Sequence, residues 1–103
     1  MTLPFAFLDS YLMIDSIHFA SISKVADLLQ SKEISPVELT DFMLNRIEAL
    51  DANLKSYATI CGDHAMEAAV KAEREITAGN YRGPLHGIPI AVKDLCNTNG
   101  IPT

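Results

Sequence analysis

The sequence predicts an α/β fold, and three observations support this fold class. Two segments, 22–31 and 35–52, place apolar residues at helical spacing and so predict two amphipathic helices. An alanine-rich segment, 63–78, predicts a third helix that ends at Gly79, a typical helix stop. The nearly unbroken apolar run over 88–92 lies between turn residues, a pattern that favours a strand covered on both faces.

Polar residues mark the expected starts of these helices. Ser21 is placed to cap the first helix by accepting a hydrogen bond from a backbone amide. The second start is the stronger signal, because Ser35 can cap, Pro36 needs no hydrogen-bonded N–H there, and Glu38 can reach back. Asp63 is expected to cap the third helix.

The predicted strands do not suffice for a complete sheet. A short strand is expected between Ser56 and Ile60, and the run over 88–92 gives a second one. A strand that is buried on both faces needs neighbouring strands and a covering layer, so we expect the domain to continue past Thr103. We therefore divide the chain into an N-terminal extension, residues 1–18, and a truncated domain, residues 19–103. Met13 is an alternative start within that extension.

Composition limits the classes of partner. The 103 residues are 49% hydrophobic and 20% charged, which excludes a disordered tail. The net charge is −5 and the basic residues are scattered, so we expect no direct nucleic-acid binding. The apolar N-terminal run has no basic n-region, contains Asp9 and Asp15, and is too short to span a bilayer; we expect no membrane partner. Two cysteines, Cys61 and Cys96, favour a cytoplasmic location.

Lys93 is the candidate catalytic residue. On a strand it would share a face with Ala91 and Leu95, and a buried ammonium must be paired, reach solvent or lose its proton. From spacing alone, a structural lysine paired with Asp63 or Asp94 is the simpler interpretation, because structural lysines far outnumber catalytic ones. The alternative is a general base, since burial favours the neutral form of lysine.

The residues around Lys93 reverse that preference. The block Gly83-Pro84-Leu85-His86-Gly87-Ile88-Pro89-Ile90-Ala91-Val92-Lys93-Asp94-Leu95, followed by Gly100-Ile101-Pro102-Thr103, closely resembles the lysine-bearing block of the amidase-signature family. The upstream segment 34–39, together with Arg46-Ile47-Glu48 and Leu54, resembles the helical lead-in of that family. The resemblance extends from about Phe19 to Thr103.

The resemblance implies a fold and a chemistry. The fold would be the N-terminal portion of an α/β/α domain, with a mixed central sheet covered by helices. The chemistry would be hydrolysis of a small-molecule carboxylic amide through a serine acyl-enzyme. A second serine on a cis peptide bond would complete the triad, with Lys93 as its base and with no cofactor or metal. A homodimer of the full-length enzyme is left open.

The sequence departs from this family pattern at its nucleophile. None of the seven serines lies in a glycine–serine-rich loop, so the chain alone is expected to be inactive. Two alternatives stay open: a fragment of the A subunit of a tRNA-dependent amidotransferase, and a non-catalytic helical remnant.

Other roles are conceivable for the same residues. His86 is expected to shape the turn before the strand, and Asp94 to brace the backbone after Lys93. A zinc site would need Cys61, His64, His86 and Cys96, which lack the close paired spacing of structural zinc ligands. A Schiff-base role for Lys93 lacks an accompanying phosphate-binding glycine loop.

Overall fold

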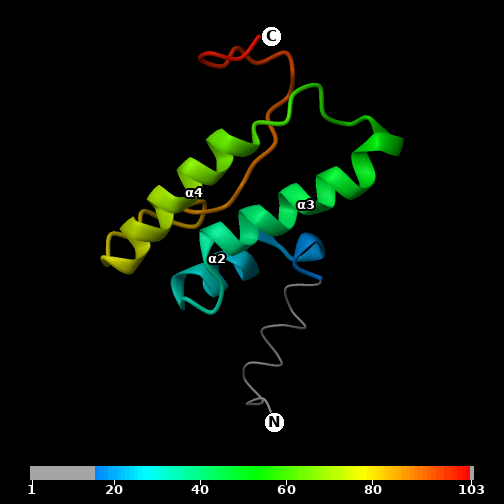
Figure 1. Cartoon of the computed structure of the whole chain (residues 1–103). Coiled ribbons are helices and arrows are strands. Elements are labelled where there is room, and N and C mark those ends of the chain that lie inside the picture. Colours follow the sequence, from blue (N-terminus) through cyan, green and yellow to red (C-terminus); the bar gives the residue numbers. More distant parts are fainter. Residues whose placement is uncertain (1–15, 103) are drawn as a thin grey trace.

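The computed structural model describes residues 16–102, which form a helical unit followed by a long irregular segment (Figure 1). In chain order the elements are the 3-10 helix η1 (Ile17–Phe19) and the α-helices α2 (Ile22–Gln30), α3 (Pro36–Leu54) and α4 (Gly62–Thr77). The alternative start at Met13 and most of the expected extension lie outside the described residues.

Helices α2 and α3 begin where the sequence predicts. The Ser21 hydroxyl accepts the N–H of Lys24 at 3.1 Å, and the Ser35 hydroxyl accepts the N–H of Glu38 at 3.0 Å. Both bonds satisfy amides that have no partner within the helix. The predicted ends differ by one residue for α2 and two residues for α3, within the usual fraying of helix termini.

Helix α4 differs from the prediction at its start. The helix begins at Gly62, its N-cap Cys61 makes no side-chain capping bond, and Asp63 lies in the first turn instead of capping it. There its carboxylate interacts favourably with the positive end of the helix dipole. The C-terminal stop is confirmed: Gly79 has a φ of 88°, and the N–H of Asn80 donates to the carbonyl of Glu75 at 2.8 Å.

The hydrophobic core lies between α2 and the N-terminal half of α3. Leu29 is its most buried side chain, with no exposed surface, and Ile88 from the segment after α4 packs against it. Helix α4 lies against α3 (Figure 1) and buries Ala69, Ala72 and Ile76. The buried members of the cluster are Ile17, Val25, Leu28, Leu29, Ile34 and Leu39.

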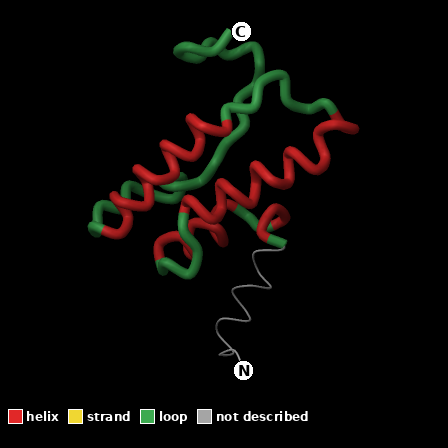
Figure 2. The backbone as a smooth tube through the Cα atoms, in the orientation of Figure 1, coloured by secondary structure: helices red, strands yellow, loops and turns green. Residues whose placement is uncertain are grey.

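The α/β prediction is wrong for the described part of the chain. Residues 16–102 contain helices and loops but no strand or sheet, and their one β-bridge is the isolated pair Thr98 and Ile101 (Figure 2). Both predicted strands, 56–60 and 88–92, are irregular. An apolar run becomes a strand only when another backbone pairs with it, and Pro89 removes one donor from this run.

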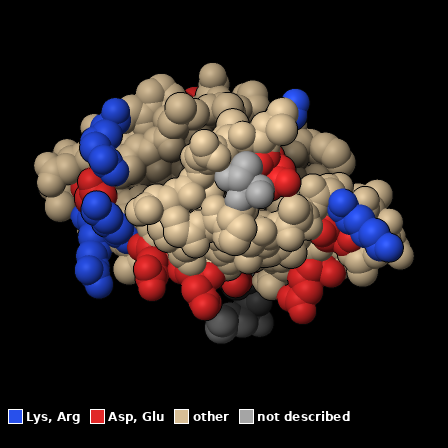
Figure 3. Space-filling view, turned by 90° about the horizontal axis from the view of Figure 1, so that it is seen from above, with Lys and Arg blue, Asp and Glu red and all other residues tan. Residues whose placement is uncertain are grey.

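The described surface has two further properties. On the face shown in Figure 3, Lys and Arg side chains gather toward the two ends and acidic side chains follow one edge, so the described residues form no basic stripe across it. None of the helices within 16–102 is long and apolar enough to cross a membrane.

Candidate functional site

Lys93 lies on an exposed, irregular segment. Residues 90–100 are all exposed, and the apolar neighbours Ile90, Val92 and Leu95 have exposed fractions of 76%, 53% and 77%. The expected covering of this segment on both faces is therefore not found. Among residues 16–102, the Lys93 side chain has no hydrogen-bond or ion-pair partner, so it is not paired with Asp94.

A backbone turn follows Lys93. The N–H of Cys96 donates to the carbonyl of Lys93 at 2.9 Å. The turn is thus closed by main-chain atoms, and within the described chain the Asp94 carboxylate does not supply the expected brace. Gly100 then adopts a φ of 78° beside the short bridge between Thr98 and Ile101.

A second turn precedes Lys93 and fixes its segment to the helices. The N–H of His86 donates to the carbonyl of Gly83 at 3.0 Å, which closes the turn. Gly87 has a φ of 87°, and a Cβ placed on it would lie 2.9 Å from Cγ of Pro36 and 3.4 Å from Cδ1 of Ile76. Glycine is therefore required both for the backbone conformation and for close approach to α3 and α4. From here the chain runs back beside the two helices (Figure 1).

His86 is the buried polar residue of this turn. Its side chain is 3% exposed, and its Nδ1 accepts the backbone N–H of Arg82 at 3.0 Å. This contact agrees with the turn-shaping role expected for His86, although no strand follows. Sequence reasoning missed two residues beside it, Glu75 and Arg82. Glu75 and Arg82 form an ion pair across the end of α4. Helical or strand spacing could not predict this pair, because the two residues do not lie in the same element.

The four candidate zinc ligands do not form a metal site. Within residues 16–102 no three His, Cys, Asp or Glu side chains gather closely enough to hold a metal ion. Cys61 and Cys96 are free thiols.

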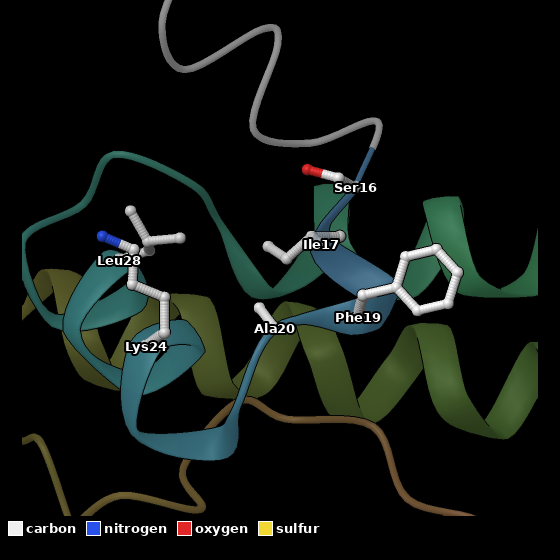
Figure 4. A pocket seen from close by; sticks show the side chains of 6 residues that line it. All are labelled: Ser16, Ile17, Phe19, Ala20, Lys24 and Leu28. Carbon is white, nitrogen blue, oxygen red and sulfur yellow. The ribbon is translucent and has the colours of Figure 1, made fainter.

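Two shallow hollows are found on the described surface. One of about 250 Å³ lies where η1 meets α2, and its lining is mainly aliphatic and aromatic (Figure 4). The other, of about 340 Å³, is lined by the turn residues Arg82 to His86. Neither hollow is lined by Lys93. The first is lined by Ser16, Ile17, Phe19, Ala20, Lys24 and Leu28.

Comparison with known families decides the assignment. The family model described as Amidase matches residues 38–103, which include most of α3, all of α4 and the whole segment with Lys93. The chain belongs to the amidase family. The resemblance that the sequence shows around Lys93 is confirmed by this match.

Individual relatives agree with the family match. The chain is 45% identical over 89 residues to "Putative amidase AmiD" of Mycobacterium tuberculosis (strain ATCC 25618 / H37Rv), covering 86% of this chain and 19% of the relative. It is 46% identical to the A subunit of the glutamyl-tRNA(Gln) amidotransferase of Geobacter metallireducens, over 81% of this chain and 17% of that protein. It is 36% identical to an amidase of Pseudomonas putida, over 81% and 18%.

The chain therefore spans less than a fifth of the length of these relatives. No solved structure matches it.

Proposed function

We propose that this chain is the N-terminal part of an amidase that hydrolyses a small-molecule carboxylic amide, with Lys93 as its general base. The observation that carries the proposal is the family match, which includes the block around Lys93. The structure supports it further, because the start of this block lies against the helices at Gly87 and packs on the core through Ile88. A general base must be held at a fixed position relative to its partner. The turn before Lys93 fixes the place where the segment with Lys93 leaves the helices.

In the proposed reaction, neutral Lys93 accepts a proton from a nucleophilic serine by way of a second serine. The serine oxygen then bonds to the amide carbon, and backbone N–H groups stabilise the negative oxygen of the tetrahedral intermediate. The C–N bond breaks as the proton passes to the leaving nitrogen, and ammonia or an amine departs. Water hydrolyses the remaining ester, releases a carboxylic acid and restores the serine.

The 103 residues alone do not hold all the parts of this reaction. None of their seven serines lies in a glycine–serine-rich loop. A lysine can accept a proton only in its neutral form, and burial favours that form, whereas Lys93 is exposed among apolar neighbours. We propose that further chain of a longer protein covers this apolar segment. The isolated chain should release no ammonia from simple amides, and measurable release would contradict this account.

The role of Lys93 is tested in a full-length protein that carries this segment. Lys93→Ala should lower kcat/KM for amide hydrolysis at least about 100-fold, because the step that generates the nucleophile loses its base. Lys71→Ala, which removes an exposed lysine from α4, is the matched control and should stay within about twofold of the parent. Equal activity of the two variants would remove Lys93 from the mechanism.

A second candidate function comes from the Geobacter relative. Its identity of 46% is close to the 45% of the mycobacterial amidase, so the corresponding subunit of a tRNA-dependent amidotransferase is favoured nearly as well. Such a subunit would pass ammonia to a charged tRNA. A full-length protein that hydrolyses simple amides by itself supports the amidase. A requirement for companion subunits, an ammonia donor and charged tRNA supports the amidotransferase.

A cytoplasmic location and a homodimer of the full-length enzyme belong to the same proposal. The two free thiols, Cys61 and Cys96, support a reducing compartment.

A further inference from the structure

A cluster of three polar side chains joins the end of α4 to the turn that precedes Lys93. Glu75 projects from the last turns of α4, Arg82 follows that helix, and His86 lies in the turn. The Arg82 guanidinium meets the Glu75 carboxylate at two points, Nε to Oε2 at 3.2 Å and Nη2 to Oε1 at 3.3 Å. The Arg82 side chain is 65% exposed, so this ion pair contributes little alone. His86 is the buried member.

The hydrogen bond at Nδ1 sets the protonation of the His86 ring. Because Nδ1 accepts the Arg82 backbone N–H at 3.0 Å, it cannot carry a proton itself. The neutral ring then carries its proton on Nε2, which lies 3.9 Å from Oε2 of Glu75. Nε2 also lies 3.5 Å from Nη2 of Arg82.

Polar groups lie on both sides of the ring. The backbone amide of Arg82 donates to one nitrogen, and Oε2 of Glu75 lies 3.9 Å from the other. Tyr81 stacks on the ring with a centroid distance of 6.0 Å. A buried imidazole that accepts a hydrogen bond at Nδ1 and stacks on Tyr81 is more constrained than a side chain that merely fills space.

Contacts with the helices stop shortly after His86. Gly87 leaves no room for a Cβ beside Pro36 and Ile76, and Ile88 packs against the core. The exposed fraction then rises to 76% at Ile90. Lys93 is five residues beyond Ile88, and its side chain has no hydrogen-bond or ion-pair partner among the described residues. The direction in which the segment leaves the helices is therefore set by the turn that contains His86.

We propose that His86 is a positioning residue for Lys93, acting through the Glu75–Arg82–His86 cluster to fix where the lysine-bearing segment leaves α4. The proposal rests on the proposed role of Lys93. It assigns to His86 no contact with substrate and no proton transfer. Its effect is geometric: loss of the Nδ1 acceptor frees the turn, and the lysine no longer meets its partner in one orientation.

The first test uses hydrogen exchange of the 103-residue chain. His86→Ala should speed exchange of the Arg82 amide at least about tenfold, because that N–H loses its acceptor, while the core amides of α2 stay unchanged. His86→Asn should restore protection, since the Asn carbonyl can accept the same N–H. His64→Ala, an exposed histidine of α4, is the matched control. Unchanged exchange in His86→Ala, or no restoration by His86→Asn, would overturn the proposal.

The second test uses amide hydrolysis by a full-length protein that carries this segment. His86→Ala should lower kcat about tenfold or more with KM within about twofold, and His86→Asn should recover most of the loss. Glu75→Gln should give a smaller loss of kcat, which supplies an independent measurement if His86→Ala folds poorly. Full kcat in His86→Ala and in Glu75→Gln, in an enzyme that Lys93→Ala inactivates, would overturn the positioning role alone. Full activity of Lys93→Ala would instead overturn the proposed function, and the exchange result would stand.

Discussion

At the scale of single residues, the position of the segment that carries Lys93 depends more on a few neighbouring residues than on its own apolar side chains. Gly87 passes close to Pro36 of α3 and Ile76 of α4, and His86 accepts the backbone N–H of Arg82 just after α4. The glycine-rich turn over 83–87 can be recognised in the sequence, and so can the lysine that follows it. The partners Glu75 and Arg82 cannot be, because their contacts depend on how the chain folds back after α4.

Gly87 gives a direct test of that close approach. Gly87→Ala should destabilise the chain by about 2–4 kcal/mol, since it combines an unfavourable positive φ with a Cβ 2.9 Å from Pro36. Gly79→Ala is the matched control, because its φ of 88° is nearly the same and nothing lies within 4 Å of its Cβ. It should cost only about 1–2 kcal/mol. Urea unfolding measures both, and equal losses would show that the contact with Pro36 is unimportant.

At the scale of elements, the sequence predicts the helices well and the strands badly. Helix starts are local events, so the serine caps at Ser21 and Ser35 can be found from neighbouring residues. A strand is not local, because its amides need a partner from elsewhere in the chain. The run over 88–92 has the composition of a buried strand, yet the described residues provide neither a paired strand nor a covering layer for it.

The cap of α3 is tested by removing its hydroxyl. Ser35→Ala should destabilise the chain by about 1 kcal/mol, because the N–H of Glu38 loses its acceptor. Ser23→Ala is a suitable control, as Ser23 is exposed in the first turn of α2 and should change stability by less than about 0.5 kcal/mol. Thermal unfolding followed by circular dichroism would measure the difference, and an unaffected Ser35→Ala would show that the cap is energetically neutral.

At the scale of the whole molecule, the helical unit buries its apolar side chains, whereas the segment with Lys93 exposes them. The core packs around Leu29, and Ile88 packs against it, whereas Ile90, Val92 and Leu95 are exposed. Three large apolar side chains so close together in sequence and so exposed indicate a surface that is normally covered. The chain spans less than a fifth of its relatives, and we propose that the rest of a longer protein provides this covering.

This difference predicts how the isolated chain behaves. Replacing Ile90, Val92 and Leu95 together by serine should reduce self-association, measured by gel filtration, and should lower the fluorescence of a bound hydrophobic dye. The helical circular dichroism signal should not change, because these side chains lie outside the core. A loss of helical signal would show that the segment supports the fold.

Proton acceptance by Lys93 is tested by Lys93→Arg in a full-length amide-hydrolysing protein. Arginine keeps the positive charge and most of the length of lysine, but it does not lose its proton in proteins. The kcat/KM of Lys93→Arg should therefore fall as far as that of Lys93→Ala, at least about 100-fold. Activity near that of the parent would show that positive charge suffices at this position and would contradict the general-base assignment.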